Sequence, residues 1–152
     1  MKLINLLLLF LLSILLLSGC SENAKNIQKF LLTKENVHVY IEKQKLIVGN
    51  EEENAAAHFN LARSYFFIKE YDSAENHARR ATRFDPLNAA YYELLGSLAF
   101  VLERYGDAVT EFATAVRISP ERVSSYLKLG ATYEKINDDG RAISSLEQAL
   151  QV

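Results

Sequence analysis

The feature that most constrains this chain is a sequence pattern that repeats with a fixed period from residue 55 onward. Leu61 recurs as Leu95 and again as Leu129, a step of 34 residues each time. The same step relates other small residues and a proline: Ala74 with Ala108 and Ala142, Ala81 with Ala115 and Ala149, and Pro86 with Pro120. A period of this length is the signature of stacked supersecondary units, which bury their apolar faces against one another. We therefore expect a repeat architecture over residues 55–152.

Each copy of the pattern predicts a helix, a short turn and a second helix. The expected helices are 55–68 and 72–84, then 89–102 and 107–118, then 124–136 and 140–150. The expected helix caps are Asn54, Asn88 and Asp107, and Asp72 with Glu75 resembles a capping box. Two prolines and six glycines in 152 residues favour long helices over a turn-rich β fold. The predicted fold class is all-α, with antiparallel helix pairs stacked as a short solenoid.

A small residue recurs in the first helix of every copy, as Ala62, Gly96 and Gly130. A glycine inside a helix costs about 1 kcal/mol relative to alanine, so its presence there needs a packing reason. We expect the second helix of each copy to cross so closely at this point that a larger side chain would clash. The expected facing residues on the second helices are Ala74, Ala108 and Ala142.

These residues together resemble the tetratricopeptide repeat (TPR) family. The segments 63–66, 71–74 and 84–88 match the family's repeat, and Leu95-Gly96 and Leu129-Gly130 match it in the later copies. The resemblance divides the chain into repeats at 55–88 and 89–122 and a truncated third repeat at 123–152. It departs from the family at His58, Tyr92 and Tyr126, where tryptophan is most common, and at Ala99, which replaces a large aromatic residue.

The resemblance implies a protein-binding groove, because first helices line the concave face of such solenoids. The implied groove residues are Phe59, Asn60, Arg63, Phe67, Leu94, Ser97, Val101, Leu127, Lys128, Ala131 and Lys135. Its expected ligand is an extended or helical peptide with hydrophobic anchors. The alternative role of Phe59, Phe66 and Phe100 is ordinary packing between helices. Phe59 and Arg63 also occupy two sites of the family's carboxylate clamp, so a clamp for a free carboxyl terminus is not expected.

Residues 1–20 are typical of a secretory signal, with Lys2, a leucine-rich run and small residues before Cys20. The ending Leu17-Ser18-Gly19-Cys20 resembles the lipobox of bacterial lipoproteins. That resemblance implies removal of residues 1–19, lipidation of Cys20 and a membrane anchor. Ser21 resembles the residue that sorts such proteins to the outer membrane. The expected location is therefore the cell envelope, on the periplasmic face of the outer membrane if the cell has one. An uncleaved helical anchor is the alternative, although the run falls short of the roughly 20 residues needed.

Residues 20–54 are expected to hold the lipidated cysteine, a polar tether and a degenerate helical segment. Apolar residues at helical spacing predict helices at about 27–33 and 36–48. The alternation of Val37, Val39 and Ile41 is a competing signal for a short strand. Glu51-Glu52-Glu53 is interpreted as a solvated start to the next helix.

Several classes of function lack support in the sequence. A net charge of −2 gives no basic surplus for nucleic acid. No phosphate-binding glycine loop and no His-Glu-x-x-His motif occurs, and His38, His58 and His77 are scattered. We expect His58 to fill a packing position and His77 to face solvent. No catalytic residue, metal site or cofactor is predicted.

The leading hypothesis is a membrane-anchored adaptor that binds a protein partner in a bacterial envelope assembly. One alternative is an accessory factor or enzyme with an unrecognised site in 27–54. Another is a self-assembling structural protein. Ile143, Leu146 and Leu150 form an apolar stripe on the final expected helix, which predicts weak homodimerisation or partner docking there.

Overall fold

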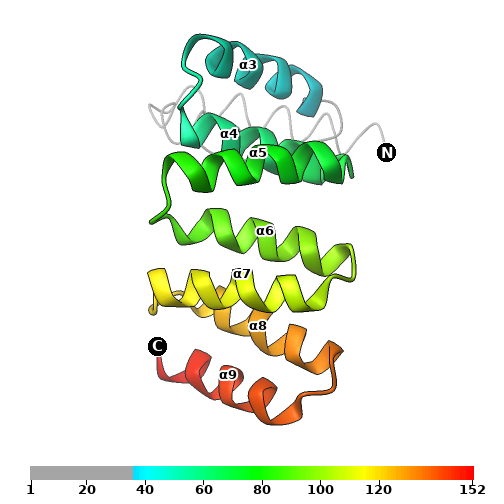
Figure 1. Cartoon of the computed structure of the whole chain (residues 1–152), viewed down its shortest axis with the longest axis vertical. Coiled ribbons are helices and arrows are strands. Elements are labelled where there is room, and N and C mark those ends of the chain that lie inside the picture. The colour runs from blue at the N-terminus through cyan, green and yellow to red at the C-terminus, as the bar shows by residue number, and fades with distance from the viewer. Residues whose placement is uncertain (1–35) are drawn as a thin grey trace, which may run out of the picture. The chain divides into compact units, whose positions relative to one another are not determined.

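The structure is a computed structural model that describes residues 36–152 (Figure 1). This part of the chain consists of α-helices joined by short turns. They are α3 (Val37–Asn50), α4 (Ala55–Phe67), α5 (Tyr71–Phe84), α6 (Ala89–Val101), α7 (Tyr105–Ile118), α8 (Val123–Lys135) and α9 (Asp139–Gln151). The predicted signal segment, Cys20, the tether and the helix at 27–33 lie outside the described residues.

The α3 segment is helical, so the strand alternative for Val37, Val39 and Ile41 is wrong. Its buried residues are Val37, Ile41 and Gln44, which follow one another at helical spacing and form one face. That face packs against α4. Burial of one side of the segment therefore outweighs the β preference of its branched side chains.

The helix starts divide into capped and uncapped ones. The side chains of Asn54 and Asn88 accept hydrogen bonds from the backbone N–H groups of Ala57 and Ala90, which confirms both predicted caps. The predicted caps Asp72 and Asp107 are wrong, because α5 and α7 begin earlier and these residues lie inside the first turn. There each carboxylate still lies favourably near the positive end of the helix.

The turn between the two helices of each repeat uses a left-handed residue that is not glycine. Lys69, Glu103 and Asn137 have φ values of 65°, 59° and 57°. In each turn the next residue's N–H donates to a carbonyl five residues back, as in Glu70 to Tyr65 at 2.9 Å. This bond satisfies a carbonyl that the helix end would leave free, and it stops the helix. The second helix then starts within two residues.

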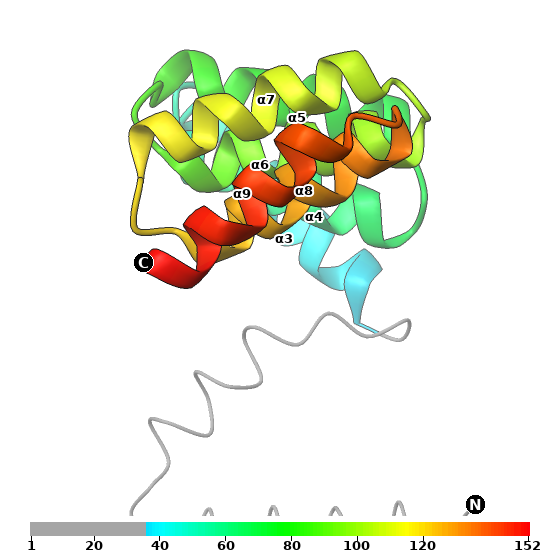
Figure 2. The same ribbon diagram turned by 90° about the horizontal axis from the view of Figure 1, so that it is seen from below.

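The helices stack one after another along the long axis of the domain (Figure 1). Helices α4 and α5, α6 and α7, and α8 and α9 form pairs, and α3 packs on α4. Within the described residues the backbone of α6 approaches those of α4 and α8, whereas the backbones of the second helices α5 and α7 do not approach each other. The first helices are therefore closer together, so the stack curves with α4, α6 and α8 on its inner side. Figure 2 views the same stack from its α9 end.

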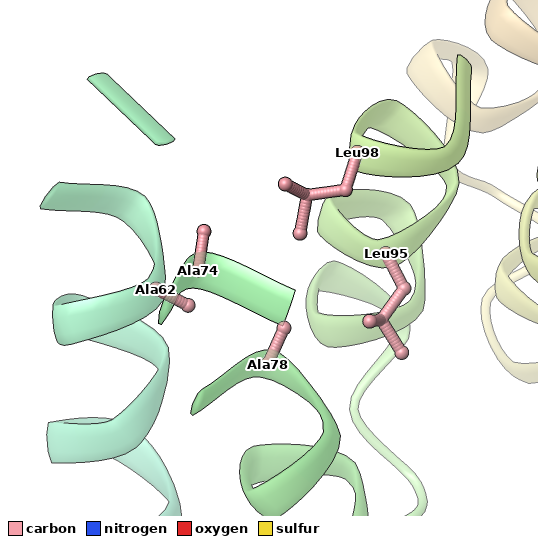
Figure 3. Close-up of a cluster of buried hydrophobic side chains, with 5 residues drawn as sticks. All are labelled: Ala62, Ala74, Ala78, Leu95 and Leu98. Atoms are coloured by element: carbon pink, nitrogen blue, oxygen red, sulfur yellow. The ribbon is translucent and has the colours of Figure 1, made fainter. Parts of the chain in front are cut away.

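Small residues allow the helices to approach closely in the core. One buried cluster joins the first and second repeats through Ala62, Ala74, Ala78, Leu95 and Leu98 (Figure 3). A second buried cluster joins the second and third repeats through Ala99, Ala108, Phe112 and Leu129. Alanines on α4 and α5 leave room for the leucines of α6, as Figure 3 shows. Each repeat thus buries its apolar face against its neighbour, as repeat architectures require.

The expected close approach at the recurring small residue is confirmed. Ala62 shares a buried cluster with Ala74, and a Cβ atom added to Gly130 would lie 3.4 Å from the backbone oxygen of Ala142. The atoms nearest to Gly96 and Gly130, however, belong to larger side chains one turn later than the predicted alanines. A Cβ atom added to Gly96 would lie 2.6 Å from the Phe112 ring. One added to Gly130 would lie 3.1 Å from Leu146. Ala108 and Ala142 are buried, and the side chains nearest to the added Cβ atoms are the larger ones four positions after them. The first repeat has alanine at both positions, Ala62 and Ala78.

Candidate protein-binding face

We call the inner surface formed by α4, α6 and α8 the A-face. It carries the residues that the sequence assigned to a groove. Among them Phe67, Val101, Leu127, Lys128, Ala131 and Lys135 are exposed, and Phe59, Asn60, Arg63, Leu94 and Ser97 are partly buried. No contact with a partner tests their role, so binding through them stays a prediction.

Apolar side chains are exposed along the A-face. Phe67 and Val101 occupy the same repeat position and are 42% and 44% exposed. Leu127 on α8 is 48% exposed. Apolar side chains that gather on one face are typical of interaction sites, and Phe67 and Val101 recur at one position of successive first helices. These are therefore the candidate anchors for a bound segment.

Other aromatic residues of the first helices pack against neighbouring rings. The Phe59 ring lies 4.8 Å from that of Tyr91, between centroids, and so links α4 to α6. Phe66 contacts Tyr71 of α5, and Phe100 contacts Tyr105 of α7, with ring centroids 5.9 and 5.5 Å apart. These two pairs link the first and second helices of one repeat. Such tilted and edge-to-face pairs stabilise the fold beyond simple burial.

The charged groups of the A-face centre on Glu93, a buried carboxylate of α6. Arg122 Nε and Lys128 Nζ lie 2.6 and 2.7 Å from its two oxygens. Burial alone would raise the pKa of the Glu93 carboxyl, but these hydrogen bonds outweigh it and hold the pKa below its usual range. The triad ties the second repeat to the third, and it leaves one surplus positive charge on the A-face.

Three other polar side chains of the A-face have partners within the chain. Asn60 Nδ2 donates to Gln44 Oε1 of α3 at 3.3 Å, so this residue links α4 to the preceding helix. Ser97 Oγ donates to the Glu93 carbonyl at 2.8 Å. The Arg63 guanidinium lies 5.7 Å from the Phe59 ring centroid, a cation–π contact.

The histidine predictions had mixed outcomes. His58 is fully buried, as its expected packing role requires. His77 was expected to face solvent, and this is wrong. Its Nδ1 lies 2.9 Å from His58 Nδ1, and its ring stacks on Tyr65. The two residues are 19 positions apart, and the repeat pattern gives no signal for their contact.

Two kinds of feature are absent from residues 36–152. No group of three or more histidine, cysteine or acidic side chains gathers there in a way that could hold a metal ion. None of the helices from α3 to α9 is long and apolar enough to cross a membrane.

Family models and curated proteins resemble this chain in sequence. Two models described as Tetratricopeptide repeat match residues 59–123 and 123–152. Tetratricopeptide repeat-containing protein trd-1 of Caenorhabditis elegans is 24% identical over 107 residues, which cover 70% of this chain and 14% of that protein. BBSome complex member BBS4 of Bos taurus is 27% identical over 135 residues, which cover 86% of this chain and 25% of that protein. The chain thus spans a quarter or less of these relatives.

Solved structures of MamA resemble the fold. A crystal structure of MamA superposes with a TM-score of 0.70 at 24% identity, covering 73% of this chain and 65% of that one. MamA from Desulfovibrio magneticus RS-1 gives a TM-score of 0.71 at 17% identity, covering 77% and 66%. At such identities the likeness establishes an all-α repeat solenoid and nothing about ligands.

Proposed function

Because the chain belongs to the tetratricopeptide repeat family, we propose that it is a membrane-anchored adaptor that holds a protein partner on its A-face. Repeat proteins of this family generally act as non-enzymatic scaffolds for protein–protein interaction, and the fold and family support that general role here. The observation that carries the specific proposal is the exposure of Phe67, Val101 and Leu127 on the inner side of the stack.

The chemistry of the A-face suggests the kind of segment that would bind. Its apolar side chains favour a partner with hydrophobic anchors. Four of its charged side chains are basic and two are acidic, so the A-face is positive on a chain of net charge −2. The basic ones are Arg63, Arg122, Lys128 and Lys135, and the acidic ones are Glu93 and Glu134. An amphipathic segment with acidic residues beside its anchors complements this surface.

Substitution of the exposed anchors tests this proposal. Phe67→Ala and Val101→Ala should each weaken capture of a partner from cell-envelope extract by the immobilised chain. Helical content and melting should stay nearly unchanged, because both side chains are already exposed. Val39→Ala is the matched control, since Val39 is an exposed valine on α3, away from the A-face. Equal binding by all variants, or a large loss of stability in the first two, would reject the A-face as the binding surface.

The membrane anchor is proposed from the sequence alone. The lipobox-like ending at Cys20 supports lipidation there, which would hold the repeat domain at the surface of an envelope membrane, the outer membrane if the cell has one. Several acyl chains make such an anchor stable, since each buried methylene contributes about 0.8 kcal/mol. Cys20→Ala should abolish labelling by a lipid precursor and leave an unprocessed chain. Unchanged labelling of that variant would eliminate this assignment.

A second candidate role is weak self-association through α9. Ile143, Leu146 and Leu150 are all exposed and lie at helical spacing on one side of that helix. A symmetric dimer would cover these side chains on both copies. Sedimentation over a range of concentrations should show a monomer–dimer equilibrium that Leu150→Lys abolishes. A chain that stays monomeric at every concentration would rule out this role.

A further inference from the structure

The basic side chains of the A-face are not equally available to a partner. Arg122 and Lys128 both contact the buried Glu93 carboxylate. A second carboxylate at that place would also meet the negative charge of Glu93. Arg63 and Lys135, in contrast, form no ion pair with any of residues 36–152. These two cations are therefore the ones that can accept a carboxylate from outside.

The Arg63 guanidinium is positioned by an aromatic ring. It lies 5.7 Å from the Phe59 ring centroid, and that ring packs on Tyr91 of α6. Stacking uses the flat face of a guanidinium, so the N–H groups at its edge stay available for a bidentate contact with a carboxylate. Within the described part of the chain these N–H groups donate to no acceptor. Arg63 is thus held on α4 with its hydrogen-bond donors unused.

Lys135 occupies the same repeat position as the two candidate anchors Phe67 and Val101. The three residues follow one another at steps of 34, on α8, α4 and α6 respectively, and all three are exposed. Helix α6 lies between α4 and α8 in the stack (Figure 1). The three side chains therefore form one row across the A-face, with two apolar members and then a positive charge at the α8 end.

Glu134 does not neutralise that charge. It is next to Lys135 in the chain, but consecutive positions of a helix do not face each other, and the two side chains form no ion pair. The charge at the α8 end of the row is therefore open to a partner.

The spacing of the row limits what can cover it. Arg63 precedes Phe67 by four positions, so both lie on one face of α4, about 6 Å apart along its axis. Packed helices lie about 10 Å apart, so each step along the row is of that order. A partner crosses such a step with about three residues if it is extended and about seven if it is helical. In both cases the two steps contain equal numbers of residues.

We propose that the segment bound on the A-face carries an acidic residue beside its first apolar anchor and another one step beyond its second anchor. The first carboxylate pairs with the edge of Arg63 and the second with Lys135, while the anchors cover Phe67 and Val101. This inference rests on the proposed binding role of the A-face and states which cations recognise the partner. Ion pairs at an exposed surface add little affinity, but they fix the register of the segment.

Selection from a displayed library of random peptides tests this inference, with the full chain immobilised in detergent as the target. The peptides should be about 20 residues long, so that a helical match also fits. Those whose binding depends on Phe67 and Val101 should share two apolar residues, with one acidic residue near the first. They should carry a second acidic residue beyond the second anchor, at the same interval that separates the anchors.

Charge reversal then tests each cation with one selected synthetic peptide. Arg63→Glu and Lys135→Glu should each weaken its binding by about 5-fold in fluorescence anisotropy. Lys43→Glu is the matched control, because Lys43 is an exposed lysine on α3, and it should leave binding unchanged. A peptide with lysine in place of both acidic residues should bind the double variant better than it binds the unmodified chain. Arg63→Gln, which adds no negative charge next to Phe59, should also weaken binding of the acidic peptide.

Failure of this inference differs from failure of the proposed function. Peptides that depend on Phe67 and Val101 but lack the two acidic residues would overturn the inference alone. The same holds for acidic peptides that bind Arg63→Gln and Lys135→Glu as tightly as Lys43→Glu. A selection that yields no peptide dependent on Phe67 or Val101 would reject the A-face as a binding surface, and the inference with it.

Discussion

Replacement of Gly96 by alanine should destabilise the domain, although alanine is the better helix former. Gly96 lies inside α6, and an added Cβ atom would lie 2.6 Å from two carbon atoms of the Phe112 ring and 2.9 Å from a third. Carbon atoms prefer separations of about 3.5–4.0 Å, so the ring must move by about 1 Å. Phe112 is almost fully buried among Ala99, Ala108 and Leu129, which leaves it little room.

The magnitude follows from two opposing effects. Overpacking of a tight core costs about 1–3 kcal/mol. Higher helix propensity of alanine returns up to about 1 kcal/mol. We therefore expect a net loss of about 1–2 kcal/mol for Gly96→Ala, seen as a fall of about 4–8 °C in Tm by circular dichroism. Gly106→Ala is the matched control, because Gly106 also lies in a helix and has nothing within 4 Å of an added Cβ. It should leave Tm unchanged or raise it.

A second substitution separates this clash from any general effect of Gly96. In the third repeat Leu146 stands at the position of Phe112. A Cβ atom added to Gly130 would lie 3.1 Å from Leu146, which is a milder clash than the one at Gly96. In a Phe112→Leu background, Gly96→Ala should therefore cost at least about 1 kcal/mol less than in the unmodified chain. If Gly96→Ala is as well tolerated as Gly106→Ala, or if its cost is unchanged by Phe112→Leu, the packing explanation is refuted.

Two further substitutions test other contacts. Glu93→Gln should destabilise the domain by about 2 kcal/mol, because it removes the carboxylate that pairs with Arg122 and Lys128, whereas Glu134→Gln on the exposed side of α8 should have little effect on Tm. Lys69→Gly should stabilise it by about 0.5 kcal/mol, because Lys69 has a φ of 65°, which glycine adopts without strain. Lys43→Gly, at an exposed position inside α3, should instead destabilise the domain by about 1 kcal/mol. Thermal melting measures both variants, and a lower Tm for Lys69→Gly than for Lys43→Gly would contradict this reasoning.

The period and the small residues were enough to predict the helices. Tetratricopeptide repeats place Ala74 and Ala108 where helices cross, and that local rule is visible in sequence. The prediction was incomplete where a contact depends on larger side chains from different helices. Gly96 and Phe112, Gly130 and Leu146, and Ala62 and Ala78 are each 16 positions apart, and the glycines occur where the later residue is large. This matching of sizes was available in the sequence as a signal for the facing residue.

Other parts of the structure had no comparable signal. The left-handed turn residues Lys69, Glu103 and Asn137 are not glycine, so the start of the second helices was placed too late. The His58–His77 contact and the Glu93 triad join side chains far apart in sequence, and no spacing rule identifies them. The exposed apolar positions of the A-face followed from the repeat register, because the same helix face recurs at every 34th residue.

Site-specific photo-crosslinking in cells tests the central claim most directly, namely that a protein partner binds the A-face. A photoreactive amino acid placed at Phe67 or at Val101 of the full chain should give the same discrete crosslinked protein. Thr110, an exposed residue of α7 on the second-helix side, is the control position and should not give it. Crosslinking of that protein from Thr110 alone, or no discrete product from either A-face position, would contradict the claim.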